Sequence, residues 1–151
     1  MSAANRIITV ISLVSAFLLV GNQARAVSPP PDGGYPNQTT AEGTNALLGL
    51  TTGNDNTALG FQALLNTTTG IQNTGAGSDA LQFNTSGNFN TGIGAAALAD
   101  NTTGFNNTAT GSGTLSSNTT GNQNTADGVA ALGSSTTADD NTATGFFLPP
   151  K

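Results

Sequence analysis

The hydrophobic and polar positions repeat every 17 residues from Thr39 to Leu148. Six complete units and one partial unit align without a gap on the consensus N-T-[AG]-x-G-x-x-A-L-x-x-N-T-T-G-x-x. A leucine occupies the ninth position of every complete unit, between segments rich in Asn, Thr and Gly. Because this leucine keeps its register, the pattern predicts a buried column that runs through stacked repeats. The column consists of Leu47, Leu64, Leu81, Leu98, Leu115 and Leu132.

The unit length predicts an all-β protein, a parallel β-solenoid. Seventeen residues are too few for a helical hairpin repeat, which takes about 33, and N-T-T-G segments are poor helix formers. We expect extended segments at repeat positions 1 to 4 and 6 to 10, turns near positions 5 and 12 to 16, and a spacing of about 4.8 Å between coils. The glycines should form corners with positive φ. At position 5 they are Gly43, Gly60, Gly77, Gly94, Gly111, Gly128 and Gly145, and at position 15 Gly53, Gly70, Gly87, Gly104 and Gly121.

Asparagine at position 1, and asparagine in the N-T-T-G turn, are expected to stack as amide ladders. The position-1 ladder, beside the threonines of position 2, is the candidate binding face. Its members are Asn56, Asn73, Asn90, Asn107, Asn124 and Asn141. The phenylalanines fall at unrelated positions and should not form a stacked core. They are Phe61, Phe83, Phe89 and Phe105.

The energetics of a narrow coil favour association between chains. Burying one leucine stabilises by about 2 kcal/mol, whereas ordering 17 residues costs on the order of 20 kcal/mol. We therefore expect the leucine columns of several chains to pack together, most simply in a parallel homotrimer. The low content of large apolar residues also fits a disordered chain, but the strict leucine register favours order. Phe146 to Leu148 are expected to cap the last coil, and the first coil has an exposed edge.

The N-terminal region predicts export. Arg6 precedes the uncharged run Ile7 to Val20, which is shorter than the roughly 20 residues of a membrane span, and Ala24-Arg25-Ala26 is a cleavage site. Residues 1–26 are interpreted as a signal peptide, 27–38 as a Pro/Gly-rich linker and 149–151 as a tail. The mature chain, with no membrane span, is expected to be secreted or held at the cell surface.

Composition argues against catalysis and against nucleic-acid binding. The chain has no Cys, His or Trp and only 7% charged residues, so disulfide scaffolds, zinc sites of the Cys/His type, haem proteins and hydrolases of the Ser-His-Asp or Cys-His type are excluded. We expect no cofactor and no metal site. Three cationic residues cannot track a phosphate backbone. Asp139 and Asp140 are adjacent and should point to opposite faces, and Asp79, in a partial calcium-repeat match, has no acidic equivalent in the other units.

The N-T-A-x-G-x-x-A-L element, as in Asn56 to Leu64, resembles the head repeats of YadA-like trimeric autotransporter adhesins. It is also similar to the N-T-T-G-x-x-N-T-A-x-G repeats of proteins named for tail-fibre domains. The resemblance covers residues 39–148. It implies a left-handed parallel β-roll, three chains side by side and a role in surface attachment.

Three function classes remain open from the sequence. The first is a surface adhesin or fibre element that binds a host, cell-surface or matrix ligand through its Asn/Thr face. The second is an extracellular matrix or filament protein that stacks end to end. The third is ice binding through threonine columns, against which we note that flat T-x-T strands are not evident.

Overall fold

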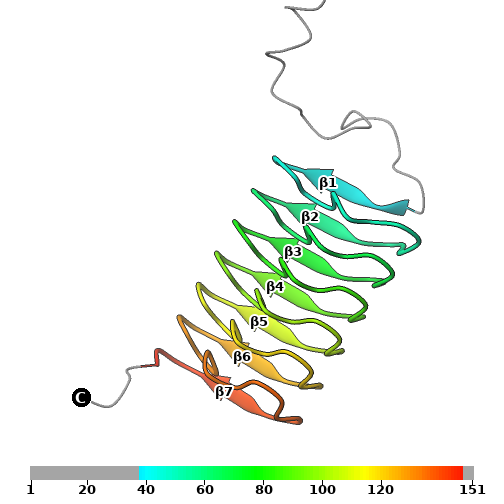
Figure 1. Ribbon diagram of the computed structural model, residues 1–151. Coiled ribbons are helices and arrows are strands. Elements are labelled where there is room, and N and C mark those ends of the chain that lie inside the picture. The colour runs from blue at the N-terminus through cyan, green and yellow to red at the C-terminus, as the bar shows by residue number, and fades with distance from the viewer. Residues whose placement is uncertain (1–37, 148–151) are drawn as a thin grey trace, which may run out of the picture.

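The computed structural model describes residues 38–147, which form a parallel β-solenoid of about six coils of about 17 residues, with no helix among them (Figure 1). Each coil contributes one three-residue strand to the same side of the stack. The predicted signal peptide, nearly all of the predicted linker and residues 148–151 lie outside the described residues. The strands are β1 (Thr40–Glu42), β2 (Thr57–Leu59), β3 (Thr74–Ala76), β4 (Thr91–Ile93), β5 (Thr108–Thr110), β6 (Thr125–Asp127) and β7 (Thr142–Thr144).

The seven strands form one parallel sheet in chain order. Each residue pairs with the residue 17 positions later, for example Thr40 with Thr57 and Thr57 with Thr74. The middle residue of each strand is Ala or Gly and points inward, where only a small side chain fits beside the leucine column. The predicted corner glycines of position 5 end every strand at φ values between 117° (Gly128) and 143° (Gly77), a region that L-residues with a Cβ avoid.

Repeat positions 6 to 10 do not form the second extended segment that we expected. They form consecutive turns, with backbone N–H to C=O bonds in one coil from Ala63 to Gly60, Leu65 to Gln62 and Thr67 to Leu64. The residues at positions 7 and 9 are left-handed, and Leu64 itself has φ 52°. Leucine does not favour this left-handed region, so the residue type at position 9 does not predict a turn. The Leu64 N–H bonds to Ala80 O of the next coil at 2.9 Å, which helps to hold the conformation.

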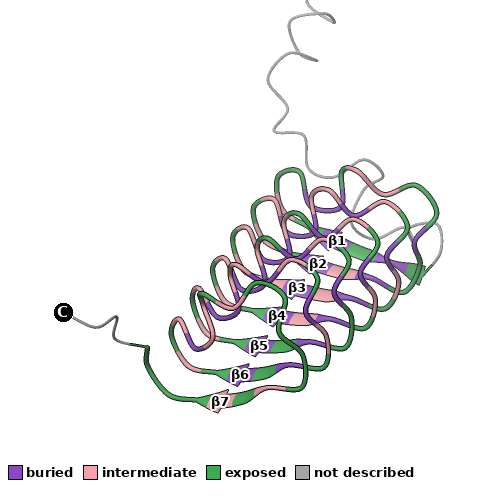
Figure 2. Ribbon diagram, turned by 60° about the horizontal axis from the view of Figure 1, so that its bottom comes forward, coloured by how far each residue is buried: buried purple, intermediate pink, exposed green. Residues whose placement is uncertain are grey.

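The core lies within a single chain. The leucine column and the alanines of positions 3 and 8 are buried (Figure 2), and Leu64, Leu81, Leu98 and Leu115 are fully inaccessible. Leu132, in the last complete coil, is partly buried. The expectation that leucines of several chains pack together is therefore wrong, because each coil folds its turns over its own leucine.

Candidate functional site

The asparagines of position 1 form a hydrogen-bonded ladder along the solenoid. Asn90 Nδ2 donates to Asn73 Oδ1 at 3.2 Å and to Gly104 O at 2.8 Å. Its Oδ1 accepts from the backbone N–H and from Nδ2 of Asn107, at 3.0 and 3.1 Å. These four hydrogen bonds use both N–H donors and both oxygen lone pairs of the Asn90 side-chain amide, which has no further bonding capacity.

This ladder is not the binding face that the sequence predicted. Asn56, Asn73, Asn90, Asn107 and Asn124 are fully buried, and Asn141, on the last strand, is partly buried. The amides turn inward because the backbone groups of neighbouring coils offer them partners that a surface position lacks. Their role in the fold is structural, and the contact surface must be sought elsewhere.

A second, shorter ladder runs through position 12. Asn101 Nδ2 donates to Asn84 Oδ1 at 2.7 Å, and Asn118 Nδ2 donates to Asn101 Oδ1 at 2.9 Å. Both ladders converge on the carbonyls of position 15, so Gly104 O accepts from Asn90 and also from Asn101 at 3.0 Å. The ladder ends where Ser135 replaces asparagine, and there Asn118 Oδ1 is buried with no hydrogen-bond partner.

The convergence explains the second glycine column. These glycines do not have the positive φ that we expected, which among the position-5 and position-15 glycines is confined to position 5. A Cβ on Gly104 would instead overlap Asn101 Oδ1 and the carbonyl of Gly121. Ala138 stands in the coil where Ser135 replaces the asparagine of position 12, so the amide oxygen that a Cβ would meet in the coils with asparagine at that position is absent there.

An outward threonine column covers the opposite face of the sheet. The first residue of every strand is threonine, and each of these residues is exposed or half-buried. Within residues 38–147 we find no hydrogen bond to their hydroxyls, in contrast to position 13, where Thr102 Oγ1 donates to Thr119 O at 2.9 Å. The column consists of Thr40, Thr57, Thr74, Thr91, Thr108, Thr125 and Thr142.

A second outward column, at position 4, lies beside the threonines. It contains exposed Leu59 and Ile93, and on β5 and β7 it contains Thr110 and Thr144, which complete two exposed T-x-T strands. T-A-T occurs in both units of the sequence, so the expectation that the chain has no evident T-x-T strands is wrong for β5 and β7. The four strands β2 to β5 carry no charged residue on this face.

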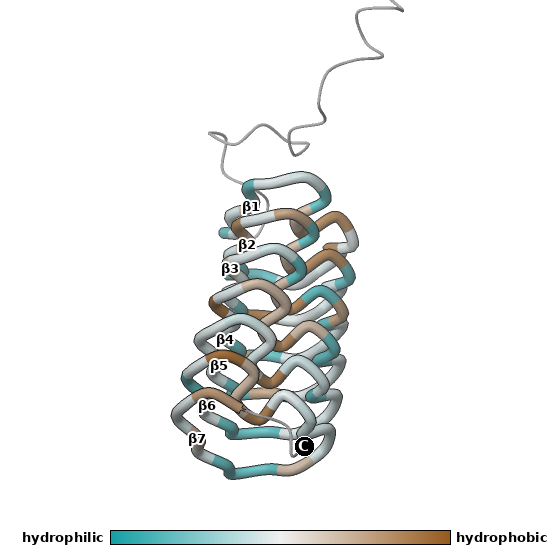
Figure 3. Tube along the Cα trace, turned by 90° about the vertical axis from the view of Figure 1, so that its left-hand side faces the viewer, coloured by the Kyte–Doolittle hydropathy of each residue, from teal (hydrophilic) through white to brown (hydrophobic). Residues whose placement is uncertain are grey.

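The large exposed side chains are scattered. Phe61, Phe83, Phe89 and Phe105 are all between 41% and 50% exposed, which confirms that they do not form a stacked core. Figure 3 shows the side of the solenoid at which the strands end, and on it hydrophobic segments are interrupted by hydrophilic ones. No continuous apolar stripe therefore marks this side.

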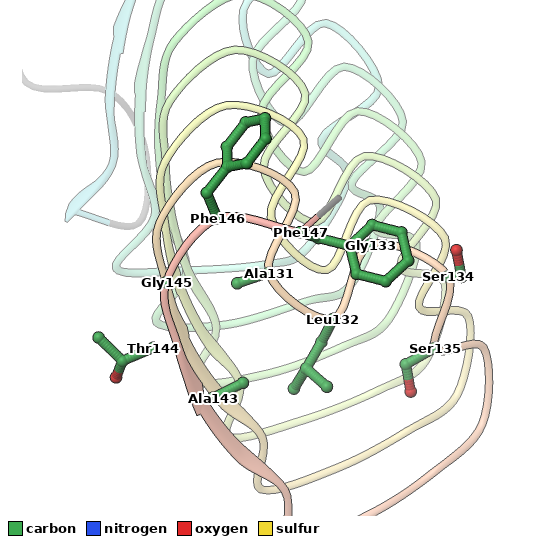
Figure 4. A pocket seen from close by; sticks show the side chains of 10 residues that line it. All are labelled: Ala131, Leu132, Gly133, Ser134, Ser135, Ala143, Thr144, Gly145, Phe146 and Phe147. Carbon is green, nitrogen blue, oxygen red and sulfur yellow. The ribbon is translucent and has the colours of Figure 1, made fainter. Parts of the chain in front are cut away.

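The C-terminal end of the solenoid is open. A cavity of about 370 Å³ lies between the last complete coil and the partial coil, lined among others by Leu132, Ser135, Ala143 and Phe147 (Figure 4). Phe146 and Phe147 remain 65% and 43% exposed. The predicted cap is thus incomplete over the part of the chain that the structure describes.

The chemistry of these surfaces is hydrogen bonding and apolar contact. Residues 38–147 bring together no group of three His, Cys, Asp or Glu side chains. Asp79 accepts a hydrogen bond from Ser78 Oγ at 2.9 Å, and Asp139 accepts one from the Asn122 backbone N–H at 2.6 Å. Among the described residues no helix is long and apolar enough to cross a membrane.

Comparison with known proteins gives no relative. No protein-family model, curated protein or solved structure matches the chain.

Proposed function

We propose that this chain is an exported surface adhesin or fibre element that binds a host, cell-surface or matrix partner through its outward threonine face, without catalysis. The observation that supports the proposal is the threonine column itself, seven residues in strict register on a regular sheet. A β-solenoid stacks each coil on its neighbours and presents an extended surface, a form that suits attachment.

The face also suggests the chemistry of its partner. Across β2 to β5 it offers hydroxyls and methyl groups at one position, and Leu59, Ala76, Ile93 and Thr110 at the other. Such a surface favours an uncharged ligand with both hydroxyl and apolar faces, because it has no cations to pair with phosphate or carboxylate. Affinity would come from many weak contacts repeated at the strand spacing.

We include a homotrimer in the proposal, with a seam different from the one first expected. Phe61 and Val129, both at position 6 just beyond the corner glycine, are 50% and 46% exposed. Packing these side chains between chains would remove apolar surface from water. The mass from sedimentation equilibrium tests this part, and a monomer at all concentrations contradicts it.

The adhesion proposal is tested by charging the face. Thr57→Glu with Thr91→Glu places two carboxylates on alternate strands, away from each other and from both ends. Thr69→Glu with Thr103→Glu, at exposed position 14, is the matched control. We expect binding to cells or matrix to fall with the first pair and to persist with the second, with circular dichroism unchanged. Equal binding by both pairs contradicts the proposal.

Ice binding is a second candidate that a specific observation favours. Thr108 with Thr110, and Thr142 with Thr144, place exposed threonines in T-x-T pairs on the same sheet face. A regular array of hydroxyl and methyl groups can order water. A thermal hysteresis assay decides this candidate, and a flat result removes it.

A further inference from the structure

The outward face of β2 to β4 carries two different spacings along the solenoid axis. Its threonines recur in every coil, at the spacing of paired strands, about 4.8 Å. At position 4, Leu59 pairs with Ala76 and Ala76 pairs with Ile93, so a single methyl group lies between two large apolar side chains. Leu59 and Ile93 are 42% and 44% exposed. Hydroxyl groups therefore recur in each coil, and large apolar groups lie two coils apart, about 10 Å.

This part of the sheet offers its side chains to a partner and not its backbone. Each of β2 to β5 is paired on both sides, so a peptide cannot join here as an added strand. The threonine hydroxyls of these four strands form no hydrogen bond within residues 38–147, and the outward positions carry no charge. Phosphate and carboxylate groups find no counter-charge on such a surface. The face therefore suits a neutral partner that combines hydroxyl groups with apolar ones.

A neutral polysaccharide has this combination, because its pyranose rings carry hydroxyl groups on their edges and C–H groups on their faces. In an extended β-linked chain of the cellulose or chitin type, each ring advances the chain by roughly one strand spacing. Successive rings are turned over, so one edge of the chain repeats its substituents at every second ring. The chain thus has the same two spacings as the face of β2 to β4.

We propose that a chitin-type chain of β-linked N-acetylglucosamine binds along the threonine column of β2 to β5, parallel to the solenoid axis. This inference rests on the attachment function proposed above and names its ligand. One ring lies over each strand and exchanges hydrogen bonds with the threonine of that strand. The acetamide methyl of every second ring lies on Ala76, between Leu59 and Ile93, which removes apolar surface from water. A glucose chain lacks this methyl group.

Isothermal titration calorimetry of the full chain with chitohexaose and with cellohexaose tests the ligand class. We expect chitohexaose to bind saturably at sugar concentrations up to roughly 1 mM. Cellohexaose should bind about tenfold more weakly or less, because it has no acetamide group to place between the two large side chains. No heat of binding with chitohexaose, or equal affinity for the two sugars, overturns the proposal.

Ala76→Leu tests the position of the acetamide group. The change fills the space between Leu59 and Ile93, and the coil tolerates leucine there, since Leu59 occupies the same repeat position. We expect chitohexaose to bind about tenfold more weakly or less, with circular dichroism unchanged. Ala99→Leu is the matched control at position 10, where another coil has Leu65, and it should bind as the unaltered chain does. Equal affinity of both variants contradicts the assignment.

Thr74→Val with Thr91→Val tests the hydroxyl groups. Valine keeps the shape of threonine and is favoured in strands, so only two hydrogen-bonding groups are lost. Chitohexaose should bind about tenfold more weakly. Thr69→Val with Thr103→Val, at exposed position 14, is the matched control and should leave the affinity unchanged. If the first pair also leaves it unchanged, the sugar does not lie on the threonine column and the proposal fails.

The same measurements separate this inference from the attachment function. If Thr57→Glu with Thr91→Glu abolishes binding to cells or matrix while chitohexaose does not bind the unaltered chain, the polysaccharide is overturned and attachment through the threonine face stands. The partner is then of another class, such as a protein. If chitohexaose binds the unaltered chain and the same pair of glutamates abolishes that binding, the polysaccharide lies on the threonine face as proposed.

Discussion

Replacement of Asn90 by alanine tests whether the buried amide ladder holds the solenoid together. The change removes four side-chain hydrogen bonds, two donated to Asn73 Oδ1 and Gly104 O and two accepted from Asn107. Three of the partner atoms, Asn73 Oδ1, Gly104 O and Asn107 Nδ2, each keep one other hydrogen bond. The backbone N–H of Asn107 keeps none among the described residues and is left buried and unpaired.

The magnitude follows from these four bonds. At about 1 kcal/mol net for each, Asn90→Ala should lower the free energy of unfolding by about 4 kcal/mol. Total stabilities are typically about 5–15 kcal/mol, so the loss is a large fraction. Asn54, exposed at position 16, makes no side-chain hydrogen bond to any of residues 38–147, and Asn54→Ala should change the free energy of unfolding by less than about 0.5 kcal/mol.

Urea unfolding followed by far-UV circular dichroism measures both variants. Asn90→Asp separates hydrogen bonding from lost volume, because it keeps the shape but turns an oxygen towards Asn73 Oδ1 and Gly104 O. We expect it to be at least as destabilising as alanine at neutral pH. If Asn90→Ala and Asn54→Ala unfold at the same urea concentration, the ladder does not stabilise the fold and the reasoning fails.

Four further substitutions test single features of the coil by the same unfolding assay. Ser135→Asn supplies a donor to the unpaired Asn118 Oδ1 and should stabilise by about 1 kcal/mol; an unchanged midpoint counts against a continuing ladder. Gly104→Ala forces a Cβ into the converging amides and should destabilise by about 3 kcal/mol, whereas Ala138→Gly should cost under about 1 kcal/mol. Ala96→Gly should stabilise by about 1 kcal/mol, because Ala96 sits at φ 55°, and a loss of stability would show that its methyl group packs.

The register of the solenoid could be predicted because the sequence repeats it without a gap. Thr40 pairs with Thr57, and the leucines stack, as the spacing of 17 requires. The corner glycines of position 5 were predictable for the same reason, since an invariant glycine after a short strand marks a position that needs positive φ. One repeated constraint therefore gave the topology and one corner of each coil.

The cross-section of the coil was harder to predict. Leu64 and its equivalents adopt a left-handed conformation that their own preference opposes, and hydrogen bonds within the coil and to the next coil stabilise it. Single-residue propensity therefore misassigned positions 6 to 10 as extended. Thr108 and Thr110 are a different case. Their T-x-T pattern is visible in the sequence, but only the structure of the sheet shows that both side chains point outward.

The main error in the predicted site was to place the asparagines of position 1 on the surface, whereas the structure buries them. This error has a general cause. Asparagine is usually an exposed residue, so the sequence predicts that a column of Asn56, Asn73 and Asn90 lies on the surface. In a narrow solenoid, however, each coil has backbone carbonyls that its own turns leave unpaired, such as that of Gly104, and the amides of Asn90 and Asn101 both donate to it.

The same ladders specify the register of the stack more strictly than the leucines do. If one coil shifted by one residue against the next, some apolar group would still lie near the axis of the solenoid. Every amide of both ladders, however, would then face a group with which it cannot form its hydrogen bond. Buried polar groups without partners are expensive in free energy, and the cost would recur in each coil. A chain with one leucine per 17 residues can therefore fold to a single register, because its asparagines disfavour all the others.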